Sequence, residues 1–202
     1  MAQIAVVYNL LTMILSDVDI KKALKSGEIT VSPYDSKNLQ QVSIDLHLDK
    51  HFLVYDDISH AVIDPKQPID HLMREVSISK DKPFVLHPGA FALGAIYETT
   101  GVSASYLGRL EGKSSVGRLG ILIHTVAGFL NPGNTMKMTL ELHNTANLPI
   151  LLYYKMPIAQ MAFEKLSSPT SQAYGSHEKL KNFYQGDTKP RASQMWKNFE
   201  VK

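Results

Sequence analysis

Apolar residues near the start of the chain recur at the spacing of an α-helix. After Ser16, which can cap a helix N-terminus, Val18, Ile20, Ala23 and Leu24 are predicted to lie on one face, and Gly27 follows them. A capping serine, apolar residues three or four positions apart and a glycine just past the end are the usual signals of a short amphipathic helix. The pattern therefore predicts one helix of about ten residues between Ser16 and Gly27.

Beyond this helix, apolar and polar positions alternate, which is the period of a half-buried strand. The stretch VSIDLHL at 42–48 sends its four aliphatic side chains, Val42 included, to the inner face and Ser43, Asp45 and His47 to the outer face. Six further short segments set off by turn residues read as strands: 84–87, 91–98, 120–126, 136–144, 149–154 and 156–166. Regular short strands with few helices predict a mostly β chain, folded as a β-sandwich, a jelly roll or a distorted barrel.

The two ends of the chain differ in composition from the middle. From Ser167 onward polar residues dominate without a period, so 167–202 is predicted to be disordered or to order against a ligand or another subunit. One domain is expected from Met13 to residue 202, with 1–12 as an N-terminal extension. That extension has no basic start, no small-residue cleavage site and too few residues to span a bilayer, so neither a signal peptide nor a membrane anchor is expected.

The composition limits the classes of partner and cofactor. The chain has 202 residues, of which 21 are basic and 19 acidic, a net charge of +2 without the basic block that tracks a nucleic acid. Cysteine is absent, which excludes disulfides and the His/Cys zinc site of nucleobase-acting zinc deaminases. None of the eight histidines falls in a close ligand spacing, so no protein-held metal is expected. A chain without cysteine fits a reducing interior, and a cytoplasmic protein is expected.

One stretch, EGKSSVGRLG at 111–120, is rich in groups that bind phosphate. Lys113 and Arg118 supply positive charge, Ser114 and Ser115 supply hydroxyl donors, and the glycines between them would let backbone amides approach a ligand. The order differs from that of the Walker A motif, G-x-x-x-x-G-K-[ST]. The stretch is therefore either a phosphate-binding loop or a solvated turn between two strands.

A second polar feature lies in the middle of a predicted strand. In MKMTLELHN, at 136–144, the aliphatic side chains face one side, while Thr139 and Glu141 face the other. Glu141 is then either an exposed strand carboxylate or a carboxylate beside a polar pocket, where it can act as a proton shuttle.

Six segments between Met13 and a point near residue 195 carry a resemblance to a known family: LEGKSSVGRLGILIH, AGFLNPG, MTLELHN, LPILLYYKMPIAQMAFEKLSSP, YGS and YQG. In sequence and order they resemble the dCTP deaminase family, a branch of the dUTPase superfamily. The resemblance implies a dUTPase-like subunit, a distorted β-barrel or jelly roll (β-clip) with a short N-terminal helix. It also implies a homotrimer whose active sites lie between subunits and are closed by the C-terminal tail, here 167–202.

The resemblance also implies roles for single residues. Glu141 becomes the acid/base, Ser114 and the backbone carbonyl of Ala127 hold the attacking water, and Arg118 orients the site. Substrate-binding roles are implied for Lys113, Ser115, Val116, Gly117, Asn131, Thr139, Leu140, Gln160, Tyr174, Lys181 and Gln185. For Gln160 the alternative is an amide bonded to the backbone at a strand end. Hydrolytic deamination needs a held water and a proton transfer, which one carboxylate can supply without zinc. Mg²⁺ is implied on the phosphates, held mainly by the nucleotide.

The chain departs from the family pattern at several of these positions. Where the family commonly has Asp-Pro-Gly-aromatic, this chain has Asn131 and Asn134 around Pro-Gly, which alters an anionic contact and an aromatic contact to the sugar. Lys113 stands in place of the usual arginine, which exchanges a bidentate fork for a point charge. Further departures fall at Val126, Phe183 and Asp187.

The leading interpretation is a dCTP deaminase that forms dUTP and ammonia for thymidylate synthesis, with dTTP as the feedback inhibitor that the family suggests. A dUTP pyrophosphatase is disfavoured, because Asn131 occupies the place of the carboxylate that would activate water and the tail is poor in glycine. Two alternatives stay open. One is a bifunctional enzyme that carries dCTP to dUMP, and the other is a non-catalytic nucleotide-binding regulator.

Overall fold

The computed structural model describes residues 13–56, 62–124, 127–176 and 182–200. The predicted extension at 1–12 lies outside these ranges. The helices are α1 (Asp17–Ser26), α2 (Ser114–Gly117) and the 3₁₀ turns η1 (Ser36–Asn38), η2 (Asp70–Leu72) and η3 (Met195–Asn198). The strands are β1 (Met13–Ile14), β2 (Ile29–Ser32), β3 (Ser43–His47), β4 (His51–Tyr55), β5 (Met73–Ser77), β6 (Phe84–Leu86), β7 (Phe91–Ala95), β8 (Thr99–Val102), β9 (Tyr106–Gly112), β10 (Ile121–Leu122), β11 (Phe129–Leu130), β12 (Thr135–Met136), β13 (Thr139–Asn144), β14 (Ile150–Leu152) and β15 (Pro157–Lys165).

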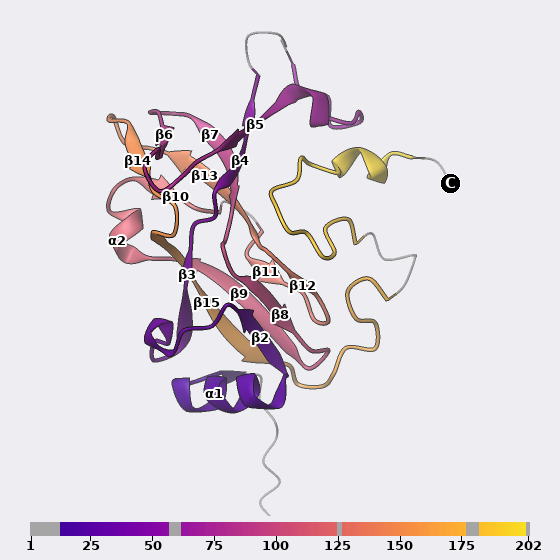
Figure 1. The fold of residues 1–202 in the computed structure, drawn as a ribbon. Helices are drawn as coiled ribbons and strands as arrows, with labels where there is room; N and C mark the ends of the chain where they lie inside the picture. Colours follow the sequence, from indigo (N-terminus) through magenta and orange to yellow (C-terminus); the bar gives the residue numbers. More distant parts are fainter. Residues whose placement is uncertain (1–12, 57–61, 125–126, 177–181, 201–202) are drawn as a thin grey trace, which may run out of the picture.

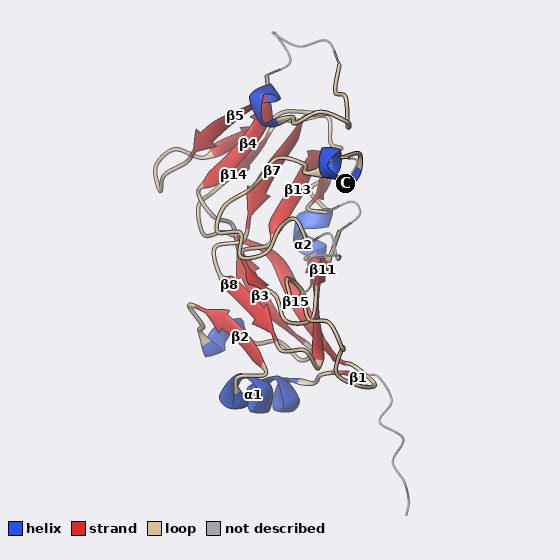
Figure 2. Ribbon diagram, turned by 90° about the vertical axis from the view of Figure 1, so that its right-hand side faces the viewer, coloured by secondary structure: helices blue, strands red, loops and turns tan. Residues whose placement is uncertain are grey.

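The strands pair into four antiparallel sheets within the described part of the chain. One sheet has the order β1-β15-β9-β11, with β3 also on β15, and a second has the order β10-β13-β7-β4-β5. Smaller sheets are β12-β8-β2 and β14-β6. The second sheet and β14 gather at one end of the molecule, while β2, β3, β8, β15 and α1 gather at the other (Figures 1 and 2). The predicted mostly β class is confirmed.

The predicted helix is α1, and its ends follow the sequence signals with one exception. Gly27 ends it in the left-handed conformation, φ 78°, which glycine adopts without steric cost. Ser16 is the N-cap, but its hydroxyl bonds Asp19 instead of a backbone amide. The helix buries Ile20 and Ala23, whereas Val18 is 53% exposed, so the prediction that Val18 lies on the apolar face is wrong. Residues two positions apart, such as Val18 and Ile20, do not share a face of a helix.

The alternation at 42–48 is confirmed for Ile44, Leu46 and Leu48, which are buried. Val42 is 51% exposed, so the prediction that it faces inward is wrong. The strand starts one residue later, at Ser43, whose hydroxyl donates to the side chain of Gln160 on β15 at 2.8 Å and is buried by that contact. A satisfied hydroxyl can replace an apolar side chain at a buried position.

One large apolar cluster fills the space between the sheets. Phe52 of β4 and Phe84 of β6 stack in it with ring centroids 4.3 Å apart. Leu140 and Leu142, the inner residues of β13, are fully buried in the same cluster. This packing fixes which face of β13 is polar.

The described parts of the tail run over the chain itself, beside β11 and β12 (Figure 1). Thr170 donates its backbone N–H to the carbonyl of Ala104 at 2.9 Å, and Tyr174 donates to Pro132 at 2.8 Å. Further on, the carbonyl of Asp187 accepts from the N–H of Lys137 at 2.7 Å. The tail therefore finds its hydrogen bonds on its own chain, although its sequence predicts disorder or a bound partner. No helix of the described ranges is long and apolar enough to cross a bilayer.

Candidate active site

A cavity of about 380 Å³ lies beside β7, β11, β12 and β13, and residues of the tail complete its wall. Five of the residues singled out from the sequence line it, namely Ala127, Asn131, Thr139, Glu141 and Tyr174. They come from three parts of the chain that are distant in sequence. The structure therefore brings together the predicted acid/base, one of the two groups predicted to hold water, and part of the predicted sugar contact.

Glu141 occupies the centre of β13, where its place is fixed on both sides. It lies opposite Leu93 of β7 in the ladder, and its backbone N–H donates to the carbonyl of Ile123 at 2.8 Å. Its side chain is partly buried at the cavity wall. Glu141 is thus not an exposed strand carboxylate but one that faces an enclosed volume.

The glycine-rich loop takes the form of the short helix α2, anchored by the buried Val116. Two of its glycine amides are already used, since Gly117 donates to the carbonyl of Lys113 and Gly120 donates to that of Gly117. Those two amides are therefore not available to a phosphate in this conformation, contrary to the sequence-based expectation. The groups left for a ligand are the exposed side chains of Ser114, Ser115 and Arg118.

The same loop is separate from the cavity. Among the described residues that line the cavity there are none from 113–118. In Figure 1, α2 lies on the opposite side of the strands from the tail. One chain therefore presents the predicted acid/base and the predicted water and charge ligands, Ser114 and Arg118, at two different places.

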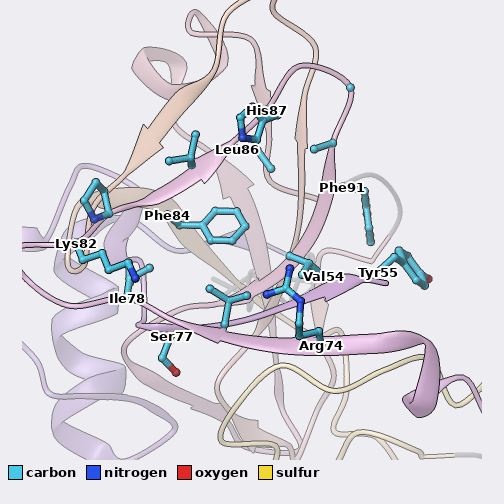
Figure 3. Close-up of a pocket in the computed structure, with 15 residues that line it drawn as sticks. Val54, Tyr55, Arg74, Ser77, Ile78, Lys82, Phe84, Leu86, His87 and Phe91 are labelled. Atoms are coloured by element: carbon cyan, nitrogen blue, oxygen red, sulfur yellow. The ribbon is translucent and has the colours of Figure 1, made fainter. Parts of the chain in front are cut away.

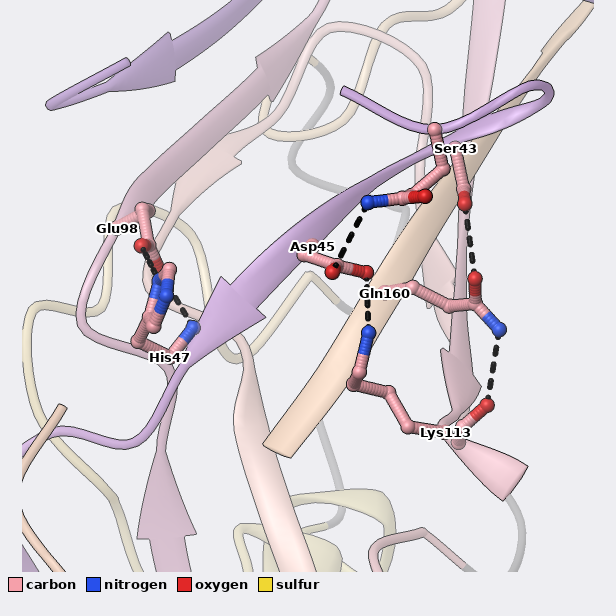
Figure 4. Close-up of polar contacts among 8 residues, drawn as sticks. Ser43, Asp45, His47, Glu98, Lys113 and Gln160 are labelled. Atoms are coloured by element: carbon pink, nitrogen blue, oxygen red, sulfur yellow. Dashed lines mark hydrogen bonds and ion pairs between the residues drawn. The ribbon is translucent and has the colours of Figure 1, made fainter. Parts of the chain in front are cut away.

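Lys113 and Gln160 are engaged at the base of the loop (Figure 4). The ammonium of Lys113 lies 2.5 Å from Oδ1 of Asp45. The side-chain amide of Gln160 accepts from Ser43 at 2.8 Å and donates to the carbonyl of Gly112 at 3.0 Å. This geometry matches the alternative reading of Gln160, an amide bonded to the backbone at a strand end, and it fixes the residue that precedes the loop.

The remaining predicted residues divide between wall, core and tail. The side chain of Leu140 is fully buried on the face of β13 away from Glu141, so only its main chain is available to a ligand. Tyr174 is in the wall, burial raises the pKa of its phenol, and its oxygen accepts from the N–H of Tyr184 at 3.4 Å. Gln185 is exposed and folds over Gly175, where an added Cβ would overlap its amide. Lys181 and Val126 lie outside the described residues.

The structure shows wall residues that the sequence did not single out. The aromatic ones are Tyr55, Phe91 and Phe129, and the charged one is Arg191. Phe129 lies within the quoted segment AGFLNPG, between Ala127 and Asn131, so that segment could have indicated it. The other three lie in segments far apart in the chain, and the tail has no period, so no sequence signal could have found them. Short loops and tails that cross a cavity are assigned by tertiary contacts alone.

Arg191 is held at the wall by two contacts within the tail. It donates to the carbonyl of Phe183 at 3.0 Å, and its other terminal nitrogen lies 2.5 Å from Oδ1 of Asp187. Asp187 is buried, and that burial raises the pKa of its carboxyl, while Arg191 acts in the opposite direction. Asp187, one of the departures from the family pattern, thus places its carboxyl group against Arg191 of the cavity wall.

The two asparagines that replace family residues both line the cavity. Asn134 is 2% exposed, and its Nδ2 contacts the sulfur of Met136 at 3.1 Å. Its Oδ1 has no hydrogen-bond partner within the described residues. Asn131 is exposed at the cavity rim and caps the turn through its carbonyl, which accepts from the N–H of Asn134 at 3.0 Å.

A protein-held metal site is not indicated by the ligand set. No group of three or more His, Asp or Glu in the described ranges is arranged to hold a metal ion. Glu141 is the one carboxylate among the described residues that line the cavity, and one carboxylate with the amides of Asn131 and Asn134 is a poor cage for a divalent cation.

Comparison with known proteins places these features in a family. The family model described as dCTP deaminase-like matches residues 14–166. A Corynebacterium jeikeium protein named "dCTP deaminase, dUMP-forming" is 48% identical over 188 residues, covering 93% of this chain and 100% of its own length. Proteins of the same name from Kocuria rhizophila and Tropheryma whipplei are 46% identical over 187 residues, covering 93% of this chain.

A solved structure supports the fold. The 2′-deoxycytidine 5′-triphosphate deaminase of Agrobacterium tumefaciens superposes with a TM-score of 0.59 at 24% identity, over 76% of this chain and 48% of that one. At this identity the likeness concerns the fold, and it agrees with the predicted dUTPase-like class. From the match of the family model and the relatives together, the chain belongs to the dCTP deaminase-like family.

Proposed function

We propose that the chain hydrolyses dCTP at C4 of the cytosine, with Glu141 as the acid/base. The observation that carries the proposal is that Glu141, partly buried, lines a cavity of about 380 Å³ together with Ala127. A carboxylate and a backbone carbonyl in the wall of one cavity can together hold a water molecule, and the carboxylate can accept its proton. The names of the relatives at 45–48% identity support dCTP as the substrate.

The steps require one water and one proton carrier. Glu141 takes a proton from the water as its oxygen bonds to C4, and the proton passes to N3 of the ring. A second proton transfer to the exocyclic amine lets the C4–N4 bond break, which releases ammonia and leaves a C4 carbonyl. Ser114 and the carbonyl of Ala127 are proposed to hold the water. Arg118 is proposed to stabilise the charge that develops.

We infer dUMP as the final product. The relatives are named dUMP-forming, which favours the bifunctional alternative that the sequence left open over dUTP as the end product. The second reaction cleaves the bond between the α- and β-phosphates of dUTP and releases pyrophosphate.

Asn131 favours a second candidate function, a deaminase that stops at dUTP. It lines the cavity where a carboxylate would activate the second water, and a carboxamide cannot accept a proton as a base.

The two separate half-sites support a homotrimer with active sites between subunits. One chain carries Glu141 in the cavity but holds Ser114 and Arg118 away from it. A neighbouring copy that supplies α2 would complete the site, and closed cyclic assemblies repeat such a contact identically. We propose that Mg²⁺ is bound through the nucleotide phosphates, where it would neutralise their charge. We also propose feedback binding of dTTP to the same site, and a cytoplasmic location.

The products test the function directly. The protein is incubated with dCTP and Mg²⁺, and ammonia, dUTP and dUMP are followed separately. Ammonia with dUMP and pyrophosphate supports the proposal, and ammonia with dUTP supports the second candidate. Binding of dCTP without ammonia contradicts both and indicates a regulator.

Subunit mixing tests the shared site. Glu141→Gln and Arg118→Ala are each expected to be inactive. When the two variants are refolded together in equal amounts, each shared site takes Glu141 from one subunit and Arg118 from its neighbour, so about a quarter of the sites have both groups intact. Recovery of about a quarter of the wild-type rate supports the shared site. If the mixture stays inactive while a mixture of either variant with wild type is active, both groups act within one chain.

A further inference from the structure

A second cavity, of about 580 Å³, lies where β4 and β5 run past β6 (Figure 3). Residues directly opposite one another in a β-ladder point to the same face of the sheet. The ladder rows are Glu75–Leu53–Leu93–Glu141 on one face and Arg74–Val54–Ala92–Leu142 on the other. Val54 and Arg74 line the second cavity, so it occupies the face of the sheet opposite Glu141.

The floor of this second cavity is apolar. Val54 and Val76 rise from the sheet, and Phe84 and Leu86 of β6 face them. Phe84 is rigid, because its ring stacks on Phe52 at 4.3 Å with an interplanar angle of 2°. The cavity is therefore an open end of the apolar layer between the two sheets, with preformed walls.

The ionisable side chains around this floor are basic, apart from the phenol of Tyr55. Arg74, Lys82 and His87 line the cavity, and its lining contains no Asp or Glu. Within the described ranges no ion pair involves any of these three side chains. In Figure 3 the guanidinium of Arg74 points from β5 toward the interior of the cavity. Arg74 and Lys82 are exposed at the cavity mouth and form no ion pair there with any described residue, so they are available to an anionic group of a ligand whose apolar part lies on the floor.

We propose that this cavity binds a small organic anion with an apolar body, with the apolar part against Phe84 and Val76 and the anionic group on Arg74. The volume suits such a ligand, since binding sites for small molecules measure about 300–1,000 Å³ and are mostly apolar with a few placed polar groups. Two sources share this chemistry. One is a nucleoside monophosphate, whose base is the apolar part, and the other is a medium-chain carboxylate.

The ligand would act on the active-site cavity through a shared wall. Tyr55 and Phe91 line both cavities, and their ring centroids are 6.2 Å apart. Phe91 belongs to β7, two residues from Leu93, which pairs with Glu141. A ligand large enough to reach Tyr55 and Phe91 from this cavity would act on two side chains that also line the active-site cavity.

Fluorescence titration with 8-anilinonaphthalene-1-sulfonate, an aromatic anion, tests the site on the intact protein. Saturable binding is expected for the wild type, about fivefold weaker binding for Arg74→Ala and a larger loss for Arg74→Glu, as for the loss of one exposed ion pair. Lys22→Ala, at an exposed lysine of α1, is the matched control and should bind like the wild type. Displacement of the probe by dTMP or by decanoate then distinguishes the two sources.

Equal binding by wild type and both Arg74 variants overturns the site. In that case the inward-facing cation serves only to keep the edge strand β5 from pairing with other chains, and the variants should differ in aggregation alone. A kinetic measurement, which rests on the proposed deaminase function, adds the coupling. Saturating probe should change the KM for dCTP in the wild type and not in Arg74→Glu. Absence of deamination would leave the binding result intact.

Discussion

Replacing Gly101 by Ala tests how the fold holds one wall of the active-site cavity. Gly101 lies in β8, the central strand of its sheet, opposite Thr135 of β12 and Thr30 of β2. A Cβ at position 101 would lie 2.4 Å from Oγ1 of Thr135 and 2.5 Å from Oγ1 of Thr30. Carbon and oxygen atoms that are not bonded usually stay about 3.3 Å apart. Both threonine side chains would therefore have to turn, or their strands would have to shift.

The expected cost follows from this overlap. Turning the Thr135 hydroxyl away gives only partial relief, because Cβ of Thr135 is itself 3.2 Å from the new atom. Overpacking of this kind destabilises by about 1–3 kcal/mol. In a chain of this size that corresponds to a fall of about 2–12 °C in Tm. Since Met136, the next residue of β12, lines the cavity, the KM for dCTP should rise as well.

Urea unfolding followed by circular dichroism, at one protein concentration, measures the change. Gly117→Ala is the matched control, since an added Cβ there meets nothing within 4 Å and the residue is helical. It should be neutral or stabilising by up to about 1 kcal/mol. Removing both hydroxyls, in Gly101→Ala with Thr30→Ala and Thr135→Ala, should recover part of the loss. Equal midpoints for Gly101→Ala and Gly117→Ala would refute the steric argument.

Three further predictions concern the site. Glu141→Gln should lower kcat for deamination about 10²- to 10⁴-fold without shifting the unfolding midpoint, whereas the exposed Glu111→Gln should leave kcat unchanged; an active Glu141→Gln refutes the proton relay. Asn131→Asp should raise the ratio of dUMP to dUTP by restoring a carboxylate to the cavity wall, and an unchanged ratio would show that position 131 takes no part in the second step. Burial raises the pKa of Asp187 above the ordinary value of 3.8, so the folded protein binds this proton more tightly than the unfolded chain does. The free energy of unfolding should therefore fall as the pH rises from 3.8 through the raised pKa. Asp187→Asn should flatten that part of the curve of urea midpoint against pH, and an identical curve would contradict the assignment.

Several elements could be predicted from the sequence because a single local pattern determines them. The helix α1 and the strands β3, β6, β13, β14 and β15 carry their period in adjacent residues, and the core selects the apolar face. The segment at 136–144 is an instructive intermediate case. It divides into β12 and β13, since Thr135 and Met136 pair with β8 while residues from Thr139 onward pair with β7. Which partner a strand takes is not encoded in its alternation.

The strand β9 shows why other elements escape a sequence-based reading. Its inner positions include Gly108, and a Cβ there would lie 3.0 Å from both Leu130 and Met161. The neighbours supply the apolar volume that the strand lacks. Arg109, at an outer position, donates to the carboxylate of Glu164 on β15. Both features stabilise β9 only when β11 and β15 are packed against it, so the sequence of β9 alone does not predict them.

The site follows the same division. The position of Glu141 could be predicted, since the alternation in β13 alone turns it away from the core. The cavity around it could not, because Tyr55 and Phe91 reach it through sheet pairing and Tyr184 and Arg191 through the tail. The resemblance to a family named Glu141 in the cavity and Ser114 and Arg118 in the loop. It did not show that one chain holds these two groups apart.

The structure of the loop at 113–118 limits which of its groups can take part in catalysis. Lys113 is paired with Asp45, and the amides of Gly117 and Gly120 are bonded within the turn, so the loop is complete as a structural element without a ligand. Whatever it contributes to catalysis must come from Ser114, Ser115 and Arg118, which point outward. Outward groups on a rigid turn can act only on a substrate that is held by another surface. In the proposed assembly a second copy of the chain, with Glu141 in its cavity, would offer that surface, and assembly would then be part of the catalytic mechanism rather than an accessory to it.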